Sequence, residues 1–223
     1  MPKKQKIASP VKALKGQEKQ YQKELNKLGK MLISAVREEL LPFLKTNQSS
    51  YVADGIADNL GVIFRRLNNQ FTGTAVAGFA KVTAQQAVER TAAANKSRFD
   101  RSVEKATGVN LAGVIEAEGL EDFKKLSVSK NVSLIKSLPE EYLKQVETIV
   151  NNGVISGARY STIQKEIMGK VGSASAKLAG RIKTIARNEI GTINAQLTVR
   201  RSEALGIKKG IYRTSQDERV RKC

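Results

Sequence analysis

Few side chains in this sequence could carry out catalysis, because it contains no histidine and a single cysteine. Without histidine, Ser-His and Cys-His catalysis and most zinc sites are excluded. Cys223 has no neighbouring base that would make it a nucleophile. The remaining candidates for metal-dependent chemistry are carboxylates, in two groups: Glu116, Glu118, Glu121 and Asp122 in EAEGLED, and Glu140 with Glu141 after a proline. Both groups are explained more simply as solvated turns or helix N-termini, so we expect no enzyme, no cofactor and no metal site.

Basic side chains dominate the chemistry instead. The chain holds 39 Lys+Arg against 21 Asp+Glu, a net charge of +18, which is typical of proteins that bind a polyanion. Nine lysines and two glutamates lie in residues 1–30, and twelve basic and four acidic residues lie in 177–223. The candidate DNA contacts are Lys3, Lys4, Lys6, Lys12, Lys15, Lys19, Lys23, Lys27 and Lys30 in the first segment, and Arg181, Lys183, Arg200, Arg201, Lys208 and Lys209 in the second.

These cations would bind phosphates rather than read bases. No base-reading motif is present, so we expect sequence-independent, salt-sensitive binding of double-stranded DNA. The alternative is that the lysine-rich ends only keep a helical protein soluble. A membrane partner has little support, because no apolar run approaches the ~20 residues of a spanning helix. The basic N-terminus is not followed by the apolar stretch of a secretory signal, and we expect synthesis in a reducing cytoplasm.

Long helices must position these side chains. Apolar residues recur at three- and four-residue steps from about 11 to 44, and Pro42 should kink or end that helix. A linker, TNQSS, precedes a second predicted helix at about 51–71, with one apolar face. An alanine-rich helix should span about 74–105 and a loop 106–119. The apolar faces are Leu14, Tyr21, Leu25, Leu28, Leu32, Ala35 and Val36 in the first helix, and Ile56, Leu60, Ile63, Phe64 and Leu67 in the second.

The second half of the chain repeats this helical pattern. Ser137 and Pro139 predict a helix start near residue 137 that continues to Gly153 or Gly157. A short helix capped by Ser161 or Thr162 follows, and then a long one over about 176–205. Gly206 should end that last helix with a Schellman cap. Residues 210–223 read as a β-hairpin, so the expected fold is mainly α, an extended bundle of long helices with a small hairpin-like element at its C-terminal end.

The last helix carries an unusual polar group. On a helical wheel, Glu189 falls near the centre of an apolar stripe, while Arg187 and Asn194 lie at its edge. Burying a carboxylate is costly unless it is paired. One hypothesis is a clasp in which Arg219 or Arg221 of the hairpin covers Glu189 and Asp217 holds Arg187 or the turn. In the alternative, the helix packs shallowly and Glu189 reaches solvent.

The end of the chain resembles a known family. IARNEIGTINAQLTVRRSEALGIKKGIYRTSQDERVRKC is similar to the signature of the Mu F-like phage head morphogenesis (minor capsid) proteins, and the resemblance extends upstream to about residue 105. The matching residues are Ala186, Arg187, Asn188, Glu189, Asn194, Leu205, Gly206, Ile207, Tyr212, Arg213, Thr214, Asp217, Glu218, Arg219 and Val220. Family members continue beyond this point, so we expect a chain that is truncated, processed or cut at Cys223.

The resemblance implies a function as well as a domain. Charge and composition indicate a basic helical arm (1–48) and an alanine-rich helical region (49–133). The resemblance implies a Mu F-like domain, incomplete at its C-terminus, over 134–223. The implied protein is a minor virion component inside the capsid, near the portal vertex of a tailed phage. It would bind the portal protein, and scaffold or major capsid protein as further candidates, and act in head assembly and DNA retention or ejection. The alternative is a protein–protein adaptor with no DNA role.

Overall fold

The computed structural model describes residues 11–12, 14–50, 55–109, 111 and 119–207. These residues are almost entirely helical, and no strand occurs among them, which confirms a mainly α fold. The predicted β-hairpin at 210–223 lies outside the described residues. The helical elements are α1 (Lys15–Ala35), η1 (Val36–Leu40), α2 (Leu41–Thr46), η2 (Gln48–Ser50), α3 (Ile56–Thr72), α4 (Thr74–Thr107), α5 (Glu121–Ile155), α6 (Tyr160–Met168) and α7 (Ala174–Ala204).

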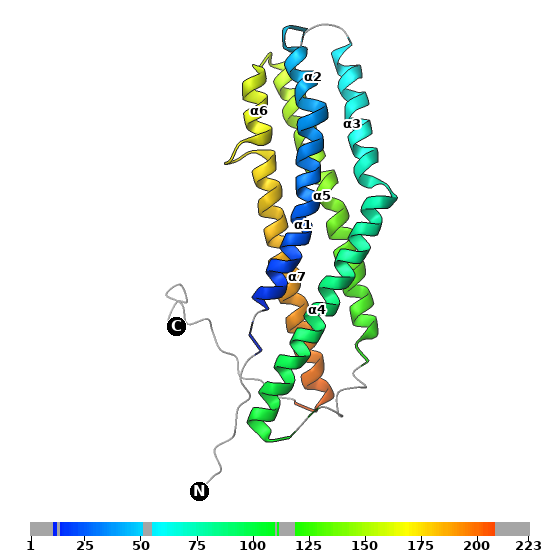
Figure 1. Ribbon diagram of the computed structural model, residues 1–223, viewed down its shortest axis with the longest axis vertical. Coiled ribbons are helices and arrows are strands. Elements are labelled where there is room, and N and C mark those ends of the chain that lie inside the picture. Colours follow the sequence, from blue (N-terminus) through cyan, green and yellow to red (C-terminus); the bar gives the residue numbers. More distant parts are fainter. Residues whose placement is uncertain (1–10, 13, 51–54, 110, 112–118, 208–223) are drawn as a thin grey trace.

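The long helices form an elongated bundle (Figure 1). Helices α1 and α5 run in one direction along its long axis, and α3, α4 and α7 run in the other. Helix α1 packs along α7, α4 packs against both α5 and α7, and α3 packs against α5. The main hydrophobic core draws residues from all of these helices and from α6. The extended bundle expected from the sequence is therefore present.

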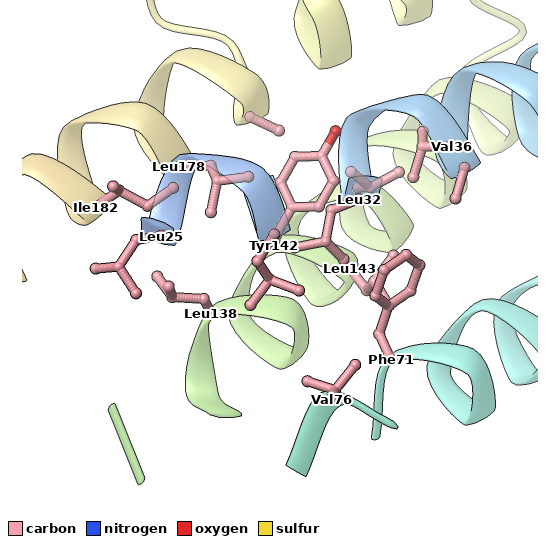
Figure 2. Packing of buried hydrophobic residues seen from close by; sticks show 14 of the residues in the cluster. Leu25, Leu32, Val36, Phe71, Val76, Leu138, Tyr142, Leu143, Leu178 and Ile182 are labelled. Carbon is pink, nitrogen blue, oxygen red and sulfur yellow. The ribbon is translucent and has the colours of Figure 1, made fainter. Parts of the chain in front are cut away.

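Leucine and aromatic side chains fill the centre of the bundle. Figure 2 shows Leu25 and Leu32 of α1 near Leu178 of α7 and Tyr142 of α5. Every residue of the apolar stripe predicted for the first helix is buried. Burying a side chain of this size contributes about 1.5–3 kcal/mol. The stripe thus fixes which face of α1 points inward.

Of the two outcomes predicted at Pro42, a kink or an end of the helix, the end does not occur, and the helical hydrogen-bonding pattern changes just before the proline. The π-helical turn η1 comes directly before it, and α2 continues to Thr46 with the proline in its first turn. Proline has no N–H and its ring crowds the preceding turn, so a normal α-helix cannot pass through it undisturbed. A π turn locally changes the hydrogen-bonding register. The helical path therefore continues across Pro42.

Helices α3 and α4 follow the predicted pattern more closely. Helix α3 begins at Ile56, after Gly55 in a left-handed conformation (φ 94°), rather than near residue 51. Its predicted apolar face is confirmed, with Leu60, Phe64 and Leu67 buried. Gly73 separates it from α4, as expected.

The predicted helix start near Ser137 is wrong. Helix α5 already begins at Glu121 and passes through Pro139 to Ile155. The Ser137 hydroxyl donates a hydrogen bond to the carbonyl of Leu134, three residues earlier in the same helix, instead of capping a new one. Pro139 is buried inside α5, and the helix continues although the proline cannot donate to the carbonyl of Ile135. The proposed domain boundary at 133/134 thus falls inside α5.

Of the ends predicted for the last two helices, the N-cap of α6 is wrong and the C-cap of α7 is confirmed. Helix α6 is present, but neither Ser161 nor Thr162 caps it, because it starts at Tyr160. Helix α7 has a side-chain cap, in which Ser173 accepts from the amide of Ala176. At its other end, Gly206 is left-handed (φ 68°). The Gly206 amide donates to Glu203 and the Ile207 amide donates to Ser202, which confirms the Schellman cap.

Candidate nucleic-acid interface

The outward face of α1 carries a continuous row of exposed cations. We define the lysine stripe as Lys15, Lys19, Lys23, Lys27 and Lys30, all of which are exposed. Four of them, with Gln22 and Asn26, line a shallow depression of about 380 Å³. The apolar face of α1 points into the bundle, so the stripe is the face left to solvent.

The lysine stripe is poorly neutralised. Among the described residues, only Lys27 has an ion-pair partner, with its Nζ 2.6 Å from Glu24 Oε2. The first four lysines are four residues apart, and like charges at this spacing destabilise a helix by about 0.2–0.5 kcal/mol per pair. The repulsion slightly destabilises α1, and binding of an external anion would relieve it.

The cations predicted on α7 are placed differently, because several contact neighbouring helices. The Arg181 guanidinium lies 2.9 Å from Glu141 Oε1 of α5. The Arg200 guanidinium lies over the Phe123 ring of α5, 4.9 Å from its centroid. Both residues are surface-exposed, but each already has a partner, so they are weaker candidates for phosphate binding than the lysine stripe.

Arg201 is not part of any exposed basic surface, and its prediction as a DNA contact is corrected. It is 3% exposed and lies between α7 and α4. Its Nη1 donates to the Asn95 side-chain oxygen and, at 3.4 Å, to the Ala92 carbonyl. Arg200 and Arg201 are adjacent in sequence, but they are about 100° apart around the helix, so one faces solvent and the other the interior.

The remaining predicted contacts are divided between exposed residues and residues that the structure does not describe. Lys12 and Lys183 are exposed, and so is Arg187, which was predicted as a residue of the clasp and not as a DNA contact. The main-chain oxygen of Lys12 accepts a hydrogen bond from Arg98 of α4, at 3.0 Å. Five predicted cations and two motif residues lie outside the described residues: Lys3, Lys4, Lys6, Lys208, Lys209, Asp217 and Arg219.

Glu189 is buried, and among the described residues Lys130 pairs with it. The residue is 7% exposed, which contradicts the shallow-packing alternative. Lys130 of α5 places its Nζ 2.9 Å from Glu189 Oε1, and Asn131 Nδ2 lies 3.4 Å from Oε2. The cation found beside Glu189 therefore comes from α5. The predicted partners, Arg219 and Arg221, lie outside the described residues.

This network extends into α1. The Tyr21 hydroxyl donates to Asn131 Oδ1 at 2.8 Å, and Asn131 Nδ2 also donates to the Ser127 carbonyl at 2.9 Å. Burial raises the pKa of Tyr21, and the negative charge of Glu189 raises it further. One buried asparagine thus joins α1, α5 and α7.

A second polar layer joins α4 to α7, and the sequence interpretation missed it. Asn95 is fully buried, and its Nδ2 donates to Asn194 Oδ1 and to Thr198 Oγ1, both at 2.8 Å. Asn194, which was expected at the edge of the stripe, is buried here. A signal existed in the sequence, because Asn95 continues the three- and four-residue spacing of the buried positions Ala84, Ala87 and Thr91.

Other sites of interest are few in the described part of the chain. A cavity of about 450 Å³ lies between α1 and α4, with Tyr21 and Ala87 among its lining residues. Across the described residues, no group of three or more acidic or cysteine side chains could hold a metal ion. None of the described helices combines the length and the apolar character needed to cross a bilayer.

Comparisons with known proteins add one relative. The chain matches no protein-family model and no solved structure. A Haemophilus influenzae protein described as uncharacterized is 26% identical over 216 residues, which cover 95% of this chain and 46% of the relative. The chain therefore spans about half the length of the curated relative that it matches, and the relative's description assigns no activity.

Proposed function

We propose that this chain is a minor capsid, head morphogenesis protein of a tailed bacteriophage. In this proposal it binds the portal protein inside the head and contacts packaged double-stranded DNA without sequence preference. The resemblance of residues 105–223 to the Mu F-like proteins supports the phage assignment. The proposal includes the β-hairpin expected at 210–223.

The lysine stripe carries the DNA half of this proposal. It presents five exposed cations on one helix face, and only one of them is ion-paired among the described residues. Lysines placed in this way bind phosphates and release counterions, so affinity depends on charge and salt rather than on sequence. Such contacts suit a protein that must hold any part of a packaged genome.

Fluorescence anisotropy with duplexes of unrelated sequence tests the DNA half. The expected result is similar affinity for each duplex and a steep fall in affinity as NaCl rises from 50 to 200 mM. Absence of binding, or binding that is indifferent to salt, would remove DNA from the proposed function.

An adaptor role without DNA is the second candidate. Two large apolar side chains favour a protein partner: Ile155 at the end of α5 is 85% exposed, and Val171 before α7 is 93% exposed. Co-expression with the portal protein followed by pull-down separates the two functions. Co-purification without DNA retention selects the adaptor, and failure to capture the portal contradicts both portal-based functions.

A further inference from the structure

The structure distinguishes between the two predicted basic surfaces. On α7, Arg201 is buried, Arg181 is ion-paired with Glu141 and Arg200 lies over Phe123. On α1, the lysine stripe is exposed along its whole length. Lys183 and Arg187 of α7 are exposed as well. Using Arg181 or Arg200 for phosphate binding, however, would break their contacts with α5, whereas using the stripe breaks at most the Lys27–Glu24 pair.

We propose that α1, rather than α7, forms the DNA contact, and that it lies along the phosphate backbone of a duplex. This inference rests on the function proposed above. The stripe occupies one side of the helix, and its lysines are reached without any rearrangement of the bundle. Gln22 and Asn26 lie among the lysines and can donate further hydrogen bonds to phosphate oxygens.

The dimensions of the stripe set the length of DNA that it covers. Lys15 and Lys30 are fifteen residues apart in α1. At about 1.5 Å per residue this is roughly 22 Å, which corresponds to about 6–7 base pairs at about 3.4 Å each. Contacts with up to about five phosphates follow from the five lysines.

The residue types on this face of α1 favour double-stranded DNA over single-stranded DNA as the ligand. Proteins that bind single strands usually stack bases on exposed aromatic side chains. The only aromatic residue in α1 is Tyr21, which is 2% exposed and faces the bundle interior. Single-stranded DNA can therefore gain only electrostatic contacts from this face. The slope of log affinity against log salt is about 0.7 per phosphate contact for a single strand, against about 0.9 for the duplex.

Two matched variants of the full chain test the assignment. The stripe variant carries Lys15→Gln, Lys19→Gln, Lys23→Gln, Lys27→Gln and Lys30→Gln. The control variant loses the same charge at exposed lysines on other elements: Lys81→Gln, Lys136→Gln, Lys144→Gln, Lys165→Gln and Lys170→Gln. Glutamine resembles lysine in helix propensity, and circular dichroism checks that both variants remain helical.

The readout is the slope of log affinity against log NaCl for a 20-base-pair duplex and its single strand. We expect the stripe variant to lower the duplex slope by up to about 4.5, from five contacts at about 0.9 each, and the control to lower it by less than about 1. Duplexes shorter than about 6 base pairs should bind much more weakly than those of 8 or more. The inference fails if both variants behave alike, or if the single strand binds as tightly as the duplex. If the wild-type chain binds no DNA, the proposed function itself fails.

Discussion

At the scale of single residues, Asn131 is a buried polar side chain that links three helices of the bundle. It accepts from Tyr21 of α1, donates to the Ser127 carbonyl of its own helix and approaches Glu189 of α7. It is fully buried, so no water can replace a lost partner without local opening. Buried polar groups that lose a partner cost about 1–3 kcal/mol each.

Replacing Asn131 should therefore destabilise the protein more than replacing Tyr21. We expect Asn131→Ala to lower the free energy of unfolding by about 2–4 kcal/mol, because the Tyr21 hydroxyl and Glu189 both lose a partner. Tyr21→Phe removes one hydrogen bond and should cost about 1 kcal/mol. Urea unfolding followed by circular dichroism measures both values, and equal losses would contradict the bridging role of Asn131.

Tyr21 also makes stability depend on pH in the alkaline range. Burial and the charge of Glu189 raise its pKa above the ordinary value of 10.0, and burial raises the pKa of Tyr142 in the same direction. The unfolded chain then loses its tyrosine protons before the folded chain does. The free energy of unfolding should fall above about pH 10, by at most about 1.4 kcal/mol per pH unit for each tyrosine.

Comparison of wild type with Tyr21→Phe isolates this effect from the titration of the lysines. We expect the variant to lose less stability than wild type between pH 9 and pH 11. Parallel stability curves for the two proteins would show that Tyr21 ionises equally in both states.

At the scale of elements, two glycines permit close helix packing. A Cβ at Gly29 would lie 2.9 Å from Ile182 Cδ1, where α1 meets α7. A Cβ at Gly153 would lie 2.6 Å from both Cγ1 and Cδ1 of Ile163, where α5 meets α6. By contrast, Gly191 lies in α7 with no atom near the position of its absent Cβ.

Alanine substitutions at two of these glycines should have opposite effects. Gly153→Ala forces Ile163 to move and should cost about 1–3 kcal/mol. Gly191→Ala should add about 0.5–1 kcal/mol, because alanine loses less conformational entropy in a helix. Thermal unfolding measures the stability of the two variants. Stabilisation by Gly153→Ala would contradict the close contact between Gly153 and Ile163.

At the scale of the whole molecule, repulsion among the positive charges destabilises the folded state. A net charge of +18 on 223 residues produces self-repulsion that salt screens. We expect the melting temperature of the free protein to rise by several degrees between about 0.02 and 0.3 M NaCl, since the Debye length falls below about 10 Å in that range. The stripe variant, with five fewer positive charges, should show a smaller rise. A melting temperature that falls with salt would indicate that ion pairs such as Lys130–Glu189 outweigh the repulsion.

The sequence by itself determined the helical class, the inward faces of α1 and α3, the Schellman end of α7 and the outward lysine row of α1. Each of these features follows from the spacing of apolar residues along one helix or from the conformation of a single turn. Only the tertiary structure decided that Lys130 pairs with Glu189, that Arg201 is buried while Arg200 is exposed, and that α5 continues through Pro139. The physical reason is that burial and pairing depend on which helices meet, and those helices are brought together from positions far apart in the chain.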